Sequence, residues 1–295
     1  ARKSRGLGDV YKRQVLIFRA TDVLSFAQPA MVVVGAGIIS YFSTQIGIPF
    51  IVAFFLGIIL TGVLGLILER TFLRPMVGEP VFSVAVLTIG IDILLRVVLD
   101  NWIGINPKYM GDPFPSYGNF GSFNIAGLTV KYLEVTALIT ALMLIFVLSV
   151  FFKKSKYGVA MRATSLDQEA ALAQGINVGR VFGLVWFIAG LLAAFAGFFI
   201  TGGFNTLTNT SFISALRALP AVVIGGLDSI TGAVVGSLII GLTQAYVGYY
   251  QFDIESAYNI KLGNGFSIVA PYVIMFVILI VKPDGLFGTE EVERV

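Results

Sequence analysis

The sequence predicts an all-α protein whose helices form a bundle and cross a membrane several times. Its 295 residues are 57% hydrophobic and only 13% charged, whereas about a quarter of the residues in a soluble domain are charged. Several apolar runs also approach the ~20 residues that an α-helix needs to cross the hydrocarbon core of a bilayer. We therefore expect a polytopic transmembrane bundle of about eight helices, some of them short or re-entrant.

The first fourteen residues differ from the rest of the chain. Residues 1–14, ARKSRGLGDVYKRQ, hold five basic residues and one acidic residue; removing them from the total of 20 basic and 17 acidic residues leaves 15 and 16. The net charge of +3 therefore comes from this segment, which we interpret as a non-native or truncated leader. A native cytoplasmic basic arm is the alternative. Nothing in this charge distribution favours nucleic-acid binding. We expect residues 15–290 to form one transmembrane domain and 291–295 a cytoplasmic tail.

The apolar runs set the expected helices, and the charged segments between them set the expected orientation. Helices are predicted near 28–44, 49–68, 81–100, 134–152, 180–201, 230–250 and 267–281, with a shorter one near 212–226 and the end of a clipped first helix at 15–24. Lys and Arg gather in segments 69–80 and 153–165, which the positive-inside rule places in the cytoplasm. The connection 101–133 contains only Lys108 and Lys131, so we expect it outside.

The C-terminal part of the chain is predicted from the parity of the crossings and from a short internal similarity. If the tail is inside, segment 202–266 must supply an even number of crossings or a re-entrant pair, which 212–226 and 230–250 would form. The stretch PAMVVVGAG at 29–37 also resembles PAVVIGGLD at 220–228. The topology gives their helices opposite directions, as an inverted repeat would, although a match this short also arises by chance.

Small residues recur at fourfold spacing within two of the predicted helices. The sets are Ala189, Ala193 and Gly197; Gly190 and Ala194; and Gly232 and Gly236. Such spacing lets helix backbones approach closely in lipid, where packing drives association. The alternative is that Gly and Ala are simply common in membrane helices.

The missing residue types exclude several functions. The chain has no cysteine and no histidine, which excludes disulfides, thiol chemistry and a Ser–His catalytic pair. No G-x-x-x-x-G-K-[ST] loop for ATP phosphates occurs, and no metal-ligand cluster is evident. We therefore expect no cofactor in this chain and no enzymatic activity. A transporter, a channel and a membrane-embedded partner protein remain.

A short polar helix is predicted at 165–175, between two very apolar runs. Its signals are the capping-box pair Ser165 and Gln168, the first-turn acids Asp167 and Glu169, the left-handed stop Gly175 and the cap Asn177 of the next helix. The expected helix has about nine residues and is roughly 14 Å long. It would lie on the inner face, where its small side chains would allow another surface to dock closely.

Segment 169–175, EAALAQG, matches the E-A-A-x-x-x-G cytoplasmic-loop motif of ABC importer permeases. Segments 153–181, 219–242 and 281–288, and ERTFLRP at 69–75, resemble branched-chain amino-acid permeases, and more closely the shorter of the two types that pair. The resemblance covers roughly 15–290. It departs at 25–29, SFAQP, where the family usually has an Asn-Phe-Ala-His-Gly-like element. Urea and short amides therefore stay open as alternative substrates.

The resemblance implies an importer in a bacterial or archaeal plasma (inner) membrane. Its partners would be a second homologous permease, two ABC ATPase subunits that bind ATP and Mg²⁺, and an extracytoplasmic substrate-binding protein. Glu169 would contact the ATPase, Ala170 and Ala171 would allow close approach, and Gly175 would turn the chain. The alternative for this helix is a surface link between two spans with no partner.

Polar residues in or beside the predicted spans are candidates for the translocation pathway. They are Ser25, Gln28, Asp92, Arg96 and Arg217. Asp92 and Arg96 have the favourable i,i+4 order, acid first, in the expected outer half of 81–100, and ionisable residues inside a membrane are functional candidates by default. The alternatives are a purely structural ion pair, and helix capping by Ser25 and Gln28. An ion-coupled secondary transporter or channel that uses Asp92 is the competing class, and a non-transporting scaffold is a third.

Overall fold

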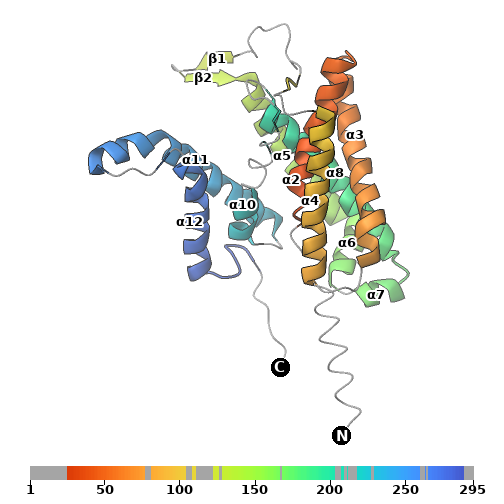
Figure 1. Cartoon of the computed structure of the whole chain (residues 1–295). Helices are drawn as coiled ribbons and strands as arrows, with labels where there is room; N and C mark the ends of the chain where they lie inside the picture. Colours follow the sequence, from red (N-terminus) through yellow and green to blue (C-terminus); the bar gives the residue numbers. More distant parts are fainter. Residues whose placement is uncertain are drawn as a thin grey trace. The chain divides into compact units, whose positions relative to one another are not determined.

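The structure is a computed structural model in which the chain is almost entirely helical (Figure 1). It describes residues 25–76, 81–103, 108–110, 122–125, 128–166, 168–202, 207–208, 211, 218–226, 229–259, 263 and 265–288. The chain divides into two compact units, Ala1–Phe212 and Ile213–Val295, which are considered one at a time. The predicted leader, the clipped first helix, Arg217 and the tail 291–295 lie outside the described residues.

Unit 1 contains most of the predicted spans. Its helices are α2 (Gln28–Ser40), α3 (Phe50–Leu68), α4 (Val81–Ile103), α5 (Tyr132–Lys154), α6 (Lys156–Leu166), α7 (Gln168–Ala173) and α8 (Val178–Thr201). Single π-helical turns extend α2 over Tyr41–Gln45 and α3 over Glu69–Leu73, and a 3₁₀ turn follows at Arg74–Met76. The predicted boundaries of the long helices are confirmed to within a few residues.

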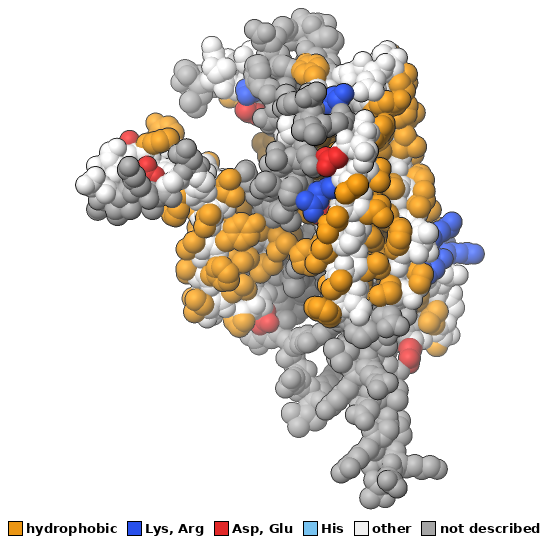
Figure 2. All heavy atoms as spheres, viewed as in Figure 1, with side chains coloured by type: hydrophobic (Ala, Val, Ile, Leu, Met, Phe, Trp, Pro, Cys, Tyr) orange, Lys and Arg blue, Asp and Glu red, His pale blue; other side chains and the backbone are white. Residues whose placement is uncertain are grey.

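The described residues of unit 2 form three further helices. They are α10 (Ala218–Gly225), α11 (Ile230–Tyr258) and α12 (Phe266–Val281). Among the described residues of the whole chain, five helical segments are long and apolar enough to cross a membrane: Phe50–Met76, Phe82–Trp102, Tyr132–Lys154, Val178–Thr201 and Thr231–Ala257. Hydrophobic side chains cover much of the visible helix surface (Figure 2), as contact with lipid requires.

Contacts at the two ends of unit 1 confirm that its helices alternate in direction as predicted. At one end the Tyr41 ring lies 5.1 Å from that of Trp102, where α2 and α4 both finish. At the other end Arg74, just after α3, donates a hydrogen bond to the carbonyl of Gly179 at the start of α8. This second end carries the basic residues, so the positive-inside rule assigns it to the cytoplasm.

The core of unit 1 is a tightly packed seam between α8 and the pair α2 and α3. A Cβ atom built on Gly190 would lie 2.4 Å from the Thr61 carbonyl oxygen, and one on Gly197 would lie 2.1 Å from that of Val32. No side chain fits at such distances, so the small residues are needed for the backbones to approach. The close packing predicted from their spacing is confirmed.

In unit 2, glycines likewise allow two helix backbones, those of α10 and α11, to pack closely. Cβ atoms on Gly232 and Gly236 of α11 would lie 2.0 Å from the carbonyl oxygens of Gly225 and Ala221 in α10. After α12 the chain returns to α10, where the amide of Leu286 donates to the Ile224 carbonyl at 2.7 Å. The amide of Phe287 donates to the Gly225 carbonyl at 3.0 Å, so the terminal segment satisfies carbonyls that a helix end leaves without partners.

The structure adds two features to the connections that the sequence did not predict, and it corrects one helix end. Segment 153–165 contains α6, which is too polar to register as an apolar run but buries Met161 and Thr164. The connection 101–133 contains an antiparallel hairpin of β1 (Ser122–Ile125) and β2 (Leu128–Lys131), with Ser122 opposite Lys131. Helix α11 continues to Tyr258 and does not end near 250, because polar residues beyond that point conceal its last turns from a search for apolar runs.

Candidate coupling and translocation sites

The short helix α7 ends as the sequence predicts. Gly175 has a φ of +80°, the left-handed conformation that favours glycine. The Ile176 amide donates to the Ala171 carbonyl at 3.0 Å, and the Gly175 amide donates to that of Leu172 at 2.9 Å, which together form a Schellman motif. Asn177 then caps α8, its Oδ1 accepting from the Arg180 amide at 3.0 Å. Both predicted roles, the stop at Gly175 and the cap at Asn177, are confirmed.

The predicted start of this helix is wrong. Ser165 lies inside α6, and its hydroxyl donates to the Arg162 carbonyl at 3.0 Å instead of accepting from an amide at the start of α7. The amide nitrogen of the Gln168 side chain is buried and has no hydrogen-bond partner among the described residues. Burial of Met161 and Thr164 carries α6 past the capping signal, so α7 has six residues and not nine. Asp167 lies outside the described residues.

The four predicted coupling residues do not share one surface. Glu169, Ala170 and Gly175 are exposed, but Ala171 is 3% exposed and packs inside its own chain. Ala171 is therefore not part of the surface that α7 exposes. The structure adds Leu172, which is 57% exposed and which the motif did not single out. The sequence could have indicated Leu172, because it is the one large apolar side chain in the motif EAALAQG.

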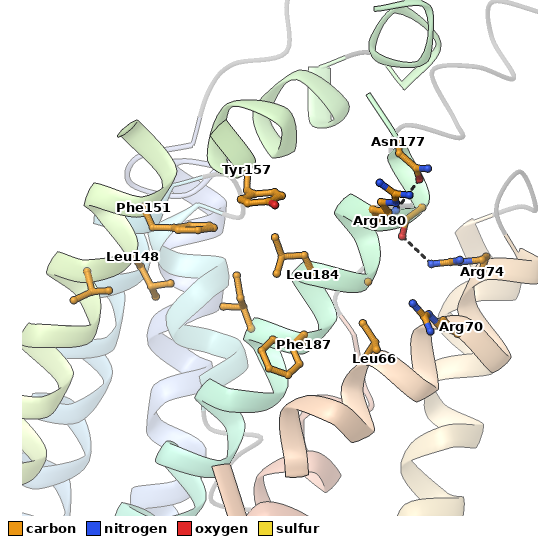
Figure 3. Close-up of a pocket in the computed structure, with 14 residues that line it drawn as sticks. Leu66, Arg70, Arg74, Leu148, Phe151, Tyr157, Asn177, Arg180, Leu184 and Phe187 are labelled. Carbon is orange, nitrogen blue, oxygen red and sulfur yellow. Dashed lines mark hydrogen bonds between the residues drawn. The ribbon is translucent and has the colours of Figure 1, made fainter. Parts of the chain in front are cut away.

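Arg74 connects the cytoplasmic ends of α3 and α8 through an ion pair and a hydrogen bond. Arg74 donates from Nε and Nη2 to the two carboxylate oxygens of Glu69 at 3.0 and 2.9 Å. The same Nη2 donates to the Gly179 carbonyl at 2.8 Å (Figure 3). Glu69 is only 2% exposed, so its charge depends on this partner. The sequence did not reveal the pair because its i,i+5 spacing becomes adjacent only through the π-helical turn at Glu69–Leu73.

Asp92 and Arg96 form the ion pair that their spacing predicts, between Oδ2 and Nη2. Asp92 is 7% exposed, and its second carboxylate oxygen is buried without a hydrogen-bond partner among the described residues. It lies at the midpoint of Val81–Ile103 and not in the outer half as expected, because α4 continues beyond residue 100. An acid at the middle of a membrane-length helix, with one oxygen that no described residue contacts by a hydrogen bond, can accept a hydrogen bond from a polar solute.

Ser25 and Gln28 lie where α2 begins. The N-cap residue of α2 is Ala27, and no side chain caps the helix, so the capping alternative is wrong. The Phe26 amide donates to the Thr88 hydroxyl at 3.3 Å, and Thr88 lies one turn before Asp92 on the same face of α4. The Ser25 hydroxyl is buried without a hydrogen-bond partner among the described residues. The structure therefore brings the start of α2 to the polar face of α4.

These features define a class: a multi-pass helical membrane protein with a glycine-packed core, buried polar groups at mid-membrane depth and a short exposed helix at its basic end. The family described as "Branched-chain amino acid transport system / permease component" matches residues 15–281. The chain belongs to this family, and it is a multi-pass plasma-membrane permease.

Individual relatives agree with this assignment. The chain is 27% identical to the high-affinity branched-chain amino acid transport system permease protein BraD of Pseudomonas aeruginosa, over 82% of this chain and 76% of that protein. It is 29% identical to LivH of Salmonella typhimurium over 83% and 77%, respectively. It is 26% identical to a probable LivH permease of Methanocaldococcus jannaschii over 93% and 86%. No solved structure matches the chain.

Proposed function

We propose that this chain is the transmembrane permease subunit of an ABC importer for branched-chain or related hydrophobic amino acids. The substrate class is the one printed in the names of BraD and LivH. In this proposal the chain pairs with a second homologous permease and receives its cargo from an extracytoplasmic binding protein. Two partner ATPase subunits bind ATP and Mg²⁺ and dock on α7, which the exposed Glu169, Ala170 and Leu172 favour.

The observation that carries the coupling role is the way α7 is attached to the membrane helices. The Schellman stop and the Asn177 cap leave only a two-residue link, Ile176 and Asn177, between Gly175 and the first turn of α8. Arg74 then joins that first turn to the end of α3, and the glycine seam joins α8 to α2 and α3. A push on α7 would therefore move these helices as one body, as coupled domain motion requires.

The polar groups at mid-membrane depth support a translocation pathway in the same unit. Ser25, Gln28, Asp92 and Arg96 would line it, and α2 would begin inside the membrane, because Thr88 lies about 10 Å along α4 from its start. Half-helix ends and paired charges at that depth are a common way to hold an amino acid's charged groups. Arg217 remains a candidate from its sequence position alone.

Substituting Gly175 tests the coupling role, and Gly47 provides a matched control. Both glycines have a φ near +80°, at +80° and +77°, and a Cβ atom on either would meet nothing within 4 Å. Gly175→Val and Gly47→Val therefore impose the same backbone strain, one beside α7 and the other in the outer connection between α2 and α3. In the reconstituted complex we expect Gly175→Val to reduce uptake at least tenfold relative to ATP hydrolysis, and Gly47→Val to preserve the ratio. Equal ratios in both variants would contradict docking on α7.

The same complex separates the competing substrates and energy sources. Uptake of labelled leucine that requires ATP and the binding protein is the expected result. Uptake of urea but not leucine would assign the chain to the amide-transporting branch of the family. Uptake by the isolated chain that follows an ion gradient without ATP would support a secondary transporter that uses Asp92.

Single cysteine substitutions test the pathway, since the chain contains no cysteine. We expect cysteines at Ser25, Gln28 and Asp92 to react with a water-soluble thiol reagent in at least one nucleotide state of the complex. A cysteine at Val86, which is half exposed on the outer surface of α4, serves as the lipid-facing control and should stay unlabelled. Absence of labelling at all three positions in every state would exclude them from the pathway.

A further inference from the structure

A cavity opens at the cytoplasmic end of unit 1, between α5 and α8. It has a volume of about 850 Å³ and is bounded by the end of α3, the last turns of α5, the start of α6 and the first half of α8. Its inner wall is apolar (Figure 3). That wall is formed by Leu66, Leu148, Phe151, Leu184, Phe187 and Ile188.

The opposite rim of the cavity is cationic. Arg70, Arg74 and Arg180 line it, and Figure 3 shows all three guanidinium groups on the side away from Leu148 and Phe151. The Arg74 guanidinium already forms an ion pair with Glu69. Arg70 and Arg180 are exposed, and within the described part of the chain no carboxylate forms an ion pair with either. The rim therefore presents two guanidinium groups whose charge is not neutralised.

The depth of these groups matches the boundary between lipid headgroups and hydrocarbon. Arg180 is the third residue of α8, and Leu184 and Ile188 lie about 6 and 12 Å further along the helix axis. Arg70 likewise falls in the last turns of the apolar segment Phe50–Met76. No residue in the membrane-crossing window of α5 is buried, so α5 does not pack closely enough to fill this cavity.

We propose that this cavity binds one anionic glycerophospholipid of the cytoplasmic leaflet. Arg70 and Arg180 hold its phosphate, for which the planar guanidinium has matching bidentate geometry, and one acyl chain lies along α8 against Leu184 and Phe187. A soluble acidic peptide could neutralise the arginines but has nothing to place against an apolar wall at hydrocarbon depth. A single phospholipid supplies both the charge and the apolar chain.

The site also adjoins the proposed coupling path. Asn177, in the link between α7 and α8, and Gly179, in the first turn of α8, both line the cavity. A lipid bound here would stiffen this link. This consequence rests on the proposed function, but the binding itself does not, so binding is measured directly on the purified full-length chain.

The test is native mass spectrometry with palmitoyl-oleoyl phosphatidylglycerol, and with phosphatidylcholine of the same chains for comparison. We expect one phosphatidylglycerol to be retained and phosphatidylcholine to bind at least tenfold more weakly. The double variant Arg70→Gln/Arg180→Gln should weaken phosphatidylglycerol binding about twenty-five-fold, at roughly fivefold for each arginine. The matched control Lys153→Gln/Lys154→Gln removes the same charge from exposed residues at the end of α5 that do not line the cavity, and should change binding less than twofold.

Several outcomes would overturn the proposal. Equal weakening by both double variants would show that the chain attracts anionic lipid only through its general basic surface. Equal binding of the two lipids would show that the site does not select an anionic headgroup. Displacement by glycerol 3-phosphate alone would indicate a free-phosphate site. Leu184→Trp fills the apolar wall and keeps both arginines, so unchanged lipid binding in this variant would show that no acyl chain lies there. Thermal unfolding of each variant confirms that a loss of binding is not a loss of fold.

Discussion

The two sides of α8 are packed in opposite ways. Toward α2 and α3 the helix presents Gly190 and Gly197, and no Cβ atom fits against the neighbouring backbone. On its other side Leu184 lines a cavity of about 850 Å³ that separates the first half of α8 from α5. One side is therefore closed by backbone contact, and the other is left open at the level of the lipid headgroups.

This difference shows how one helix can be held in place on one side and stay accessible to other molecules on the other. In lipid, helices gain little from burying apolar side chains, and close van der Waals packing supplies the attraction between them. The closed side thus holds α8 in place and transmits its position to α2 and α3. The open side costs little in stability, because its apolar walls face lipid tails as readily as protein.

The largest expected effect comes from breaking the closed side. Gly190→Leu would force a side chain into the Thr61 backbone, which cannot rotate away as a side chain could. We expect a loss of more than about 3 kcal/mol in stability, beyond ordinary overpacking, and little folded protein in the membrane. Gly90→Leu is the matched control, since a Cβ atom at Gly90 in α4 meets nothing within 4 Å. Thermal unfolding in detergent and the yield of folded protein measure both. Similar behaviour of the two variants would show that the seam does not limit stability.

Shortening one leucine in the closely packed part of unit 1 and one at the cavity should give smaller, unequal losses of stability. Leu68, at the end of α3, is 3% exposed, whereas Leu148 of α5 lines the cavity. We expect Leu68→Ala to cost about 2 kcal/mol, the lower end for a buried leucine, because lipid supplies no hydrophobic transfer term. Leu148→Ala should cost less than about 0.5 kcal/mol, since it enlarges a cavity that already exists. The shift in the midpoint of thermal unfolding compares them, and equal shifts would mean that α5 packs as closely as α3.

The sequence predicted the fold wherever a single periodic signal was strong. The long helices, the close packing at Gly190 and Gly197, the stop at Gly175 and the cap at Asn177 all follow from local apolar runs, small-residue spacing or capping chemistry. Predictions failed where tertiary packing overrode a local signal. The capping box at Ser165 is an example, because burial of Met161 and Thr164 extends α6 through it.

Within the candidate sites, the same division holds. The i,i+4 spacing of Asp92 and Arg96 was enough to predict their ion pair. The Glu69–Arg74 pair was not predictable, because its partners meet only through a π-helical turn and the Gly179 carbonyl is supplied by a helix more than a hundred residues away. The exposure of Leu172 and the burial of Ala171 likewise depend on which face of α7 packs against its own chain.

By itself, the sequence determined that this protein is a helical membrane permease, and its motifs placed it in a transport family. Apolar length, loop charge and capping are local properties, which act over a few residues of chain. Only the tertiary structure decided which helices pack against the small residues of α8, where Arg70 and Arg180 meet an apolar wall, and how α7 is joined to α3. These arrangements depend on contacts between residues distant in the chain, and no local pattern encodes them.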